Sequence, residues 1–256
     1  MLKFKIIIVL FMTAFAFTVF SQTKKTKDVK DNYSKIELSF SIGYSRPLLE
    51  AYGENVTINS AEDQLFIDEK RLIDSDNFGT NTGYGVQTYL KYSLMKKGRV
   101  KALFNLGYNI LKGNYPGPSD YDIGVRIQSF SAGIGTEVNP IGHNSVVYPA
   151  VFGLMRMNFM GGETYHKAGL DFFKVTPRYG YTAGFKLYFR VKNTIDMFAG
   201  YSYTYDNAWG KQTEDNVVNT DRTIVFRDEK SPSNGLTANR RVAYWGLYLG
   251  MNFFFK

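Results

Sequence analysis

From residue 35 onward, apolar side chains alternate with small or polar ones along most of the chain, and no helical periodicity is sustained. In KIELSFSIGYS, for example, one face runs from Ile36 to Tyr44, and the other carries the alternate positions from Glu37 to Gly43. The alternation predicts strands at 35–45, 82–94, 99–110, about 126–138, about 145–159, 177–191, 196–206 and 242–255. In the fifth of these segments apolar residues occupy both faces, so its register stays open.

The connections between these segments alternate strictly in length. The short ones are 95–98, 139–144 and 192–194. The long ones are about 46–81, 111–125, 160–176 and 207–240. Tight turns on one side, long loops on the other and an even number of strands are typical of outer-membrane β-barrels. A chain of 256 residues is also long enough for one large all-β domain.

A water-soluble β-sandwich would show the same alternation, so other features decide between the two. Aromatic residues stand at the ends of the outward rows, as the girdle of a membrane barrel requires. They are Tyr44, Tyr84, Tyr92, Tyr108, Tyr205 and Trp245. The opposite faces combine Gly, Ser and Thr with charges, and the strands, at about 9–11 residues or more, are long enough to cross a bilayer when tilted. The sequence therefore predicts an all-β fold, an eight-stranded antiparallel up-and-down transmembrane β-barrel, over residues 36–256.

The first residues do not fit this pattern. Lys3 and Lys5 precede an apolar run over 6–20. The side chains just before the expected cleavage site, up to Ser21, are small or of modest size. This is the pattern of a cleaved secretory signal peptide over residues 1–21. A retained membrane anchor is the alternative, but the run is short for a spanning helix.

Removal of the signal peptide leaves 256 − 21 = 235 residues and lowers the formal charge from +8 to 8 − 2 = +6. The polar, basic segment 22–35 is then expected to be a flexible periplasmic leader. The basic excess lies in this leader, in turns and in the barrel interior rather than in a groove-reading motif, which argues against a nucleic-acid partner.

Composition excludes several classes of protein. The chain has no cysteine, which excludes a disulfide scaffold, a thiolate metal site and a cysteine nucleophile. Charged residues make up 21% of the chain, which excludes a helical polytopic membrane protein. Aromatic residues make up 16%, enough to bury ample apolar surface, so wholesale disorder is also excluded.

Charged residues on the predicted inward faces form a candidate lumen charge cluster near the periplasmic end. Its members are Glu37, Lys91, Arg99, Lys101, Glu137, Lys186 and Arg190. Side chains just fill an eight-stranded barrel, so these groups must pair or stay hydrated. Five cations against two carboxylates suggest spare positive charge, and a structural plug of ion pairs is the plainer alternative.

Farther out, the predicted inward residues are small. They are Ser41, Gly43, Gly83, Gly107, Ser131, Gly180 and Ser202. Such positions leave room for water, a folded-in loop or a small ligand, although Tyr188, Tyr244 and Tyr248 are large enough to fill the space. A continuous pore is not implied.

The last strand carries a pattern found at the end of bacterial outer-membrane barrels. Apolar residues occupy alternate positions up to an aromatic one; they are Trp245, Leu247, Leu249, Met251, Phe253 and Phe255. With the signal peptide ending in Ser21-Gln22 and the glycine pairs Gly83/Gly85 and Gly133/Gly135, the chain resembles the small eight-stranded OmpA/OmpX-type barrels. More narrowly, it resembles the outer membrane protein beta-barrel domain and PorT-like proteins of Bacteroidota. Lys256 departs from the terminal signal by one residue.

This resemblance implies an outer-membrane location with both termini in the periplasm, insertion by the barrel assembly machinery, and outer-membrane lipid as a partner. It specifies activity poorly, because one fold hosts many functions.

Catalytic chemistry has little support in the sequence. The only histidines are His143, in a predicted turn, and His166, in a predicted outer loop. No serine lies between Ser145 and Ser202, so a local Ser–His pair is absent around His166. We therefore expect no catalytic site and no cofactor.

Metal binding has one candidate locus, the loop 46–81. It contains Glu50, Glu54, Glu62, Asp63, Asp68, Glu69, Asp74 and Asp76. Carboxylates suit hard divalent cations, but no EF-hand spacing is present. A solvated acidic loop is the better interpretation, and no metal site is predicted.

The sequence thus predicts an integral barrel with a non-enzymatic structural or surface-interaction role. The loops 46–81 and 207–240 are the candidate contacts for an envelope or extracellular protein. Strand-like stretches in 211–240 could extend the last two strands as a hairpin. A small-ligand binding or transport barrel and a lipid-modifying enzyme using His166 are the alternatives.

Overall fold

The structure is a computed structural model, divided into two units, Met1–Asn32 and Tyr33–Lys256. The described residues are 34–51, 79–95, 98–116, 122–142, 145–166, 169–210, 213–214, 223–224, 228–230, 237–238 and 241–255. The predicted signal peptide, and the leader up to residue 33, lie outside them. The fold is therefore that of the second unit.

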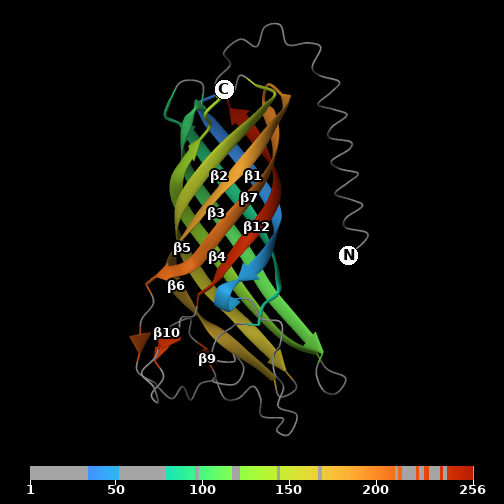
Figure 1. The fold of residues 1–256 in the computed structure, drawn as a ribbon, viewed down its shortest axis with the longest axis vertical. Helices are drawn as coiled ribbons and strands as arrows, with labels where there is room; N and C mark the ends of the chain where they lie inside the picture. Colours follow the sequence, from blue (N-terminus) through green and yellow to red (C-terminus); the bar gives the residue numbers. More distant parts are fainter. Residues whose placement is uncertain are drawn as a thin grey trace. The chain divides into compact units, whose positions relative to one another are not determined.

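Eight long strands form the second unit. They are β1 (Ile36–Leu48), β2 (Thr82–Ser93), β3 (Val100–Pro116), β4 (Asp122–Val138), β5 (Val147–His166), β6 (Gly169–Lys192), β7 (Ile195–Trp209) and β12 (Ala243–Phe255). Each pairs antiparallel with its neighbours along the chain, and β1 also pairs with β12, which closes the sheet (Figure 1). The predicted eight-stranded up-and-down barrel is confirmed.

The register fixes the width of this barrel. A line of paired residues that starts at Ile36 and passes through all eight strands returns to β1 at Arg46, a shear of 46 − 36 = 10 residues. With a rise of about 3.3 Å per residue and about 4.8 Å between strands, the strands tilt by about 41° and the backbone radius is about 8 Å. Side chains from opposite walls therefore meet across the interior.

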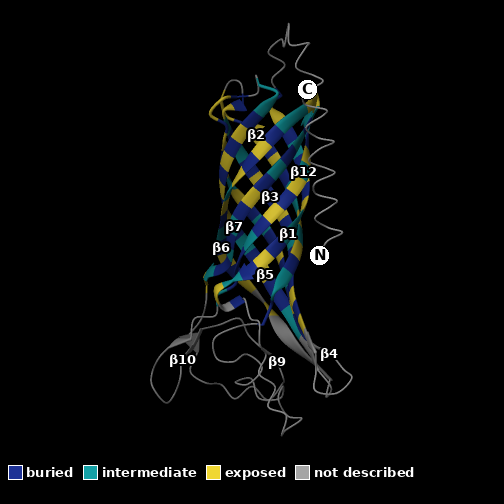
Figure 2. Ribbon diagram, turned by 45° about the vertical axis from the view of Figure 1, so that its right-hand side comes forward, coloured by how far each residue is buried: buried dark blue, intermediate teal, exposed yellow. Residues whose placement is uncertain are grey.

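Buried and exposed residues alternate along every strand, which gives the checkerboard of Figure 2. The predicted inward and outward faces are confirmed in seven strands. In β5 the structure resolves the open register, because Tyr148, Phe152 and Arg156 are buried while Val151 and Met155 are exposed. The ambiguity arose because part of the barrel interior is itself apolar.

The two ends of the barrel differ in their connections. Residues 94–99, 139–146 and 193–194 link strands at one end, which we call the turn end; Gly98 and Gly142 adopt φ values of 63° and 76° in two of these turns. The described chain starts there, where the Ser34 hydroxyl lies within hydrogen-bond distance of the carbonyl oxygens of Ile36, at 2.6 Å, and Phe255. We call the opposite end the loop end.

Two predicted long loops, 111–125 and 160–176, were wrong. β3 continues to Pro116 and β4 begins at Asp122, while β5 and β6 are separated only by residues 167–168. The reason is that the polarity of the two faces inverts beyond the apolar band. There Leu111 and Ile127 point inward and are buried, whereas Lys112 and Arg126 point outward.

The expectation that 211–240 extends the last two strands as a hairpin was also wrong for its described residues. Four short strands lie there: β8 (Thr213–Glu214), β9 (Thr223–Ile224), β10 (Asp228–Lys230) and β11 (Thr237–Ala238). β10 pairs with β8 and β11, and β9 pairs in parallel with β6. Among the described residues, no helix is long and apolar enough to cross a membrane.

The close approach of β4 and β5 gives a stability prediction. A Cβ on the inward Gly135 would lie 1.9 Å from the carbonyl oxygen of Gly153 and 2.8 Å from the Cα of Leu154. Both are backbone atoms, so Gly135→Ala must move one strand. We expect it to lower the free energy of unfolding by about 1–3 kcal/mol, measured by urea titration of the folded barrel.

Gly153→Ala is the matched control. A Cβ on Gly153 would meet no atom within 4 Å, so we expect a change within about 0.5 kcal/mol. Equal effects of the two substitutions would contradict the packing of these strands.

Candidate functional site

Five charged side chains meet inside the barrel near the turn end, and we call this group the ion layer. Its members are Glu37 of β1, Lys91 of β2, Lys101 of β3, Glu137 of β4 and Lys186 of β6. Each occupies an inward position of its alternating strand, and each is 0% exposed. The structure thus brings together five of the seven residues of the candidate lumen charge cluster.

Glu137 is the centre of the ion layer. One of its carboxylate oxygens, Oε1, lies 3.4 Å from the Lys91 ammonium and 3.5 Å from that of Lys101. The other, Oε2, lies 3.0 Å from the ammonium of Lys186. Lys101 also pairs with Glu37 at 2.8 Å. Removing charges from water is costly, and here each lysine faces at least one carboxylate that offsets that cost.

Neutral groups complete the ion layer. The hydroxyl of Tyr188 donates to Glu137 at 2.8 Å and accepts from Lys91 at 2.6 Å. Asn252 donates to Glu37 at 3.0 Å. Neutral polar side chains therefore donate to both carboxylates in addition to the lysines, which strengthens the buried charge network.

Aromatic rings lie near all three lysines of the ion layer and are closest to Lys186. The ammonium of Lys186 is 3.9 Å from the ring centroid of Tyr89 and 4.5 Å from that of Phe152. Such contacts stabilise a desolvated ammonium.

The remaining two predicted cluster residues lie elsewhere. Arg190 is partly buried and pairs with Asp196 of β7 at 3.4 Å, and Tyr148 also donates to Asp196. Arg99 is exposed, so the expectation that it projects into the barrel was wrong. It precedes β3 in the turn, where strand alternation no longer applies.

Asp196 also changes the charge balance. In the described barrel, four cations (Lys91, Lys101, Lys186 and Arg190) face three carboxylates (Glu37, Glu137 and Asp196) near the turn end. The spare positive charge near the turn end is therefore 4 − 3 = 1 among these residues, smaller than the 5 − 2 = 3 expected from the sequence. Asp196 was absent from the predicted lumen charge cluster, although the alternation in the predicted strand 196–206 places it on the inward face.

Apolar and aromatic side chains fill the next level toward the loop end, which we call the aromatic layer. Its members are Tyr89, Leu103, Phe152, Leu154, Phe198 and Tyr248, each at most 8% exposed. The rings of Tyr89 and Phe152 pack edge to face at 6.2 Å, as do those of Phe198 and Tyr248. The ion layer and the aromatic layer together occupy the cross-section of the barrel.

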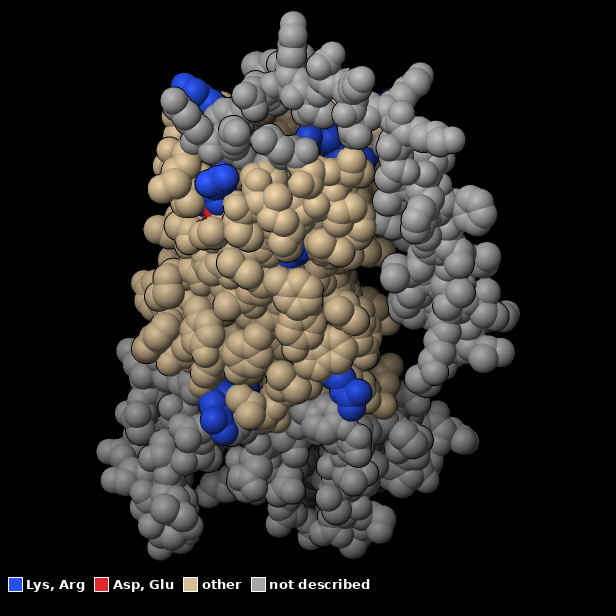
Figure 3. Space-filling model, turned by 45° about the horizontal axis from the view of Figure 1, so that its top comes forward, with Lys and Arg blue, Asp and Glu red and all other residues tan. Residues whose placement is uncertain are grey.

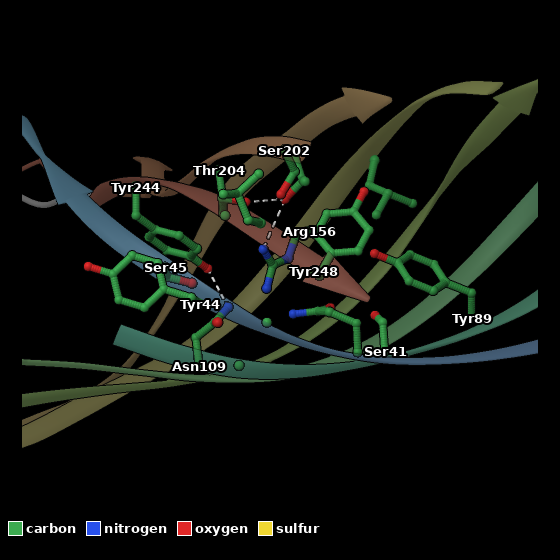
Figure 4. Close-up of a pocket in the computed structure, with 17 residues that line it drawn as sticks. Ser41, Tyr44, Ser45, Tyr89, Asn109, Arg156, Ser202, Thr204, Tyr244 and Tyr248 are labelled. Carbon is green, nitrogen blue, oxygen red and sulfur yellow. Dashed lines mark hydrogen bonds between the residues drawn. The ribbon is translucent and has the colours of Figure 1, made fainter. Parts of the chain in front are cut away.

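A small polar cavity follows the aromatic layer on its loop-end side (Figure 4). Arg156 of β5 extends into it, donates to Thr182 at 2.9 Å and also to Ser131, and pairs with Asp206 of β7 at 3.5 Å. The sequence reasoning missed both charged residues. Arg156 lies in the fifth strand, whose register was open, and its position within an apolar strand was the available signal.

The predicted small inward residues do line this cavity in part. Ser41, Gly43 and Ser202 border it together with the two large residues Tyr244 and Tyr248. The space open to the centres of water molecules is about 30 Å³, enough for about two ordered waters. Tyr188 instead belongs to the ion layer.

Other candidate sites fall largely outside the described residues. His143 and the acidic residues of the loop 46–81, apart from Glu50, are not among them, and the side chain of His166 is not described. Within the described part of the chain, no group of three or more His, Asp or Glu side chains is arranged to hold a metal ion.

The outer surface defines the class of protein. Outward apolar residues extend along β1 from Ile36 up to Arg46, a height of about 25 Å at the strand tilt derived above, which matches the apolar band of membrane barrels. At its loop-end border Tyr44 packs edge to face with Tyr84 and with Trp245, at 5.9 and 6.1 Å. The chain is therefore an eight-stranded transmembrane β-barrel.

The residues of the predicted C-terminal insertion signal belong to this surface. Trp245 and Phe253 are partly exposed, and Leu247, Leu249, Met251 and Phe255 are 42–52% exposed, all on the outward face of β12. Their recognition by the assembly machinery stays a prediction.

The chain was also compared with known proteins. No family model and no curated protein matches the sequence. Among solved structures, Neisserial surface protein A is 14% identical, with 87% of this chain and 98% of that chain covered and a TM-score of 0.48. Ail, the attachment invasion locus protein of Yersinia pestis, in complex with the heparin analogue sucrose octasulfate, is 13% identical (86% and 99% covered, TM-score 0.42). The outer membrane protease OmpT from Escherichia coli is 9% identical (90% and 100% covered, TM-score 0.41).

At these identities and TM-scores the solved structures carry no argument about this chain. Its own closed sheet of eight antiparallel strands confirms the resemblance to small eight-stranded barrels at the level of the fold, whereas the narrower resemblance to PorT-like proteins stays a prediction. The protease activity in the name of OmpT is a property of that protein and carries no argument about this chain.

Proposed function

We propose that the protein is a sealed outer-membrane scaffold with a non-enzymatic role. In this proposal the barrel anchors the chain in lipid, both termini face the periplasm, and the loop end presents the segments 46–81 and 207–240 at the cell surface. There they contact an envelope or extracellular protein.

The observation that carries this proposal is the filled interior near the turn end. The charged side chains of the ion layer are 0% exposed and joined by ion pairs, and aromatic rings pack directly beside them. A transport barrel needs a continuous hydrated path, and a binding barrel needs a cavity larger than the one beside Arg156, which holds about two waters. A filled interior instead suits a rigid membrane anchor.

Conductance distinguishes the scaffold from the transport alternative. We expect the full-length mature protein to show no stepwise current in planar lipid bilayers and no sugar-driven swelling of liposomes. A gel-shift assay on the same sample, with and without boiling, controls for insertion of the folded barrel. A steady current from the folded protein would overturn the sealed scaffold.

Orientation has a separate test, which the absence of natural cysteine makes simple. Single cysteines placed at residue 70, in the loop 46–81, and at residue 96, in a turn-end connection, are treated with a membrane-impermeant maleimide on intact cells. We expect labelling at residue 70 only. Labelling at residue 96 alone would show that the turn end, and not the loop end, faces the outside of the cell. Labelling at both positions only after lysis would show that neither segment is exposed at the cell surface, which would contradict the proposed surface role.

A further inference from the structure

Basic side chains form a row across the outside of the barrel near the loop end. Lys112 of β3 pairs directly with Arg126 of β4, and Lys112 also pairs with Thr82 of β2. Because Ser45 pairs with Gly83, the next step along these two strands brings Arg46 of β1 opposite Thr82. Arg46, Lys112 and Arg126 thus lie on one register line and are exposed; we call them the basic row.

This arrangement places two like charges directly opposite each other. Lys112 and Arg126 are cross-strand partners on the same face of the sheet, a geometry that is unfavourable without a counter-charge. Glu163 of β5, the next residue on the register line, pairs with Arg126 at 2.9 Å. Among the residues with described side chains, Glu163 is therefore the one carboxylate on this register line.

The height of the basic row on the barrel is informative. It begins at Arg46, where the apolar band of about 25 Å ends. The ammonium of Lys112 lies 5.7 Å from the ring centroid of Tyr84, which belongs to the aromatic border of that band. Aromatic residues at such borders sit at the level of lipid headgroups, so the row lies where headgroup phosphates would be.

The rest of the described surface agrees with an anionic environment. Six Lys and Arg residues with described side chains are exposed: Lys35, Arg46, Arg99, Lys112, Arg126 and Lys192. Every Asp or Glu with a described side chain is buried or partly buried. In Figure 3 most of the blue basic residues lie toward the two ends of the described barrel surface, and the surface between them is mostly tan, the colour of residues other than Lys, Arg, Asp and Glu.

We propose that the basic row binds the phosphate group of a membrane lipid in the leaflet at the loop end. This proposal rests on the membrane placement in the proposed function, but not on the sealed interior. Lys112 and Arg126 hold the phosphate between them, and Arg46, about 10 Å from Lys112 across β2, contacts the same headgroup or its neighbour. The acyl chains then lie along the apolar band below Tyr84.

Native mass spectrometry of the full-length mature protein in detergent tests this site. The protein is titrated with phosphatidylglycerol and, separately, with diacylglycerol of the same chains, which lacks the phosphate. We expect phosphatidylglycerol to bind more tightly by at least about tenfold, since each nearby Lys or Arg contributes about fivefold. Lys112→Gln together with Arg126→Gln should weaken it by about 25-fold.

Two control variants and one charge reversal lie on the same register line. Lys112→Arg keeps the charge and should retain binding within about twofold. Glu163→Gln removes the one carboxylate with a described side chain on this register line and should tighten binding. Lys112→Glu places opposite charges across β3 and β4 and should abolish the preference for phosphatidylglycerol, while the gel shift on boiling shows that the barrel is still folded.

Inorganic phosphate separates a lipid site from a general anion site. We expect 10 mM phosphate to displace little phosphatidylglycerol, because it lacks acyl chains to lie on the apolar band. Complete displacement, equal binding of the two lipids, or unchanged binding in the double variant would each overturn the proposal. A conducting wild-type protein would overturn the sealed scaffold while leaving this result unaffected.

Discussion

Replacement of Glu137 by glutamine is expected to lower the free energy of unfolding of the barrel by about 3–5 kcal/mol. Glu137 lies within 3.5 Å of the ammonium groups of Lys91, Lys101 and Lys186, all of them 0% exposed. A glutamine preserves the volume but removes the negative charge. One carboxylate of the ion layer, that of Glu37, would then face three buried cations, and water would have to enter to compensate them.

The measurement is equilibrium unfolding in urea, followed by tryptophan fluorescence and by the gel shift on boiling. Glu163→Gln is the matched control, because it makes the same change in a pair whose arginine, Arg126, is 46% exposed. An exposed pair of this kind contributes about 0–1 kcal/mol. If Glu137→Gln also falls in that range, the ion layer does not hold the interior together.

The sequence predicted the barrel well where one rule applied along a whole strand. Inside the apolar band, outward residues must be apolar and inward residues small or polar, so alternation located all eight strands and oriented seven of them. Beyond the band the rule inverts. Lys112 and Arg126 face outward while Leu111 and Ile127 face inward, and the strand ends were therefore mistaken for loops.

The interior was predictable in part for a related reason. Glu37, Lys91 and Lys101 stand out because each is a charge at a regular inward position within two residues of a strand end. The pairing of Arg156 with Asp206 could not be predicted in this way, because it joins β5 to β7 and depends on which face of β5 points inward. Distances across the lumen follow from the shear of the closed sheet, and alternation within a single strand carries no information about shear.

Ile42→Arg tests the membrane placement on which both proposals depend. Ile42 is 70% exposed on the outward face of β1, near the middle of the stretch from Ile36 to Arg46. In a bilayer an arginine there must leave water, so we expect a loss of about 2–4 kcal/mol in the free energy of unfolding from liposomes. Insertion from urea should also slow.

Ile36→Arg is the matched control on the same strand and the same face. Ile36 lies at the turn-end border of the apolar band and is 46% exposed; there the same substitution should cost about 0–1 kcal/mol, because its guanidinium reaches the headgroups. In a water-soluble barrel the order would differ, since the more exposed Ile42 would then face solvent and its replacement by arginine would be neutral. A larger loss at Ile42 than at Ile36 is therefore the signature of lipid around the barrel, and equal small losses would place the apolar band against something other than a bilayer.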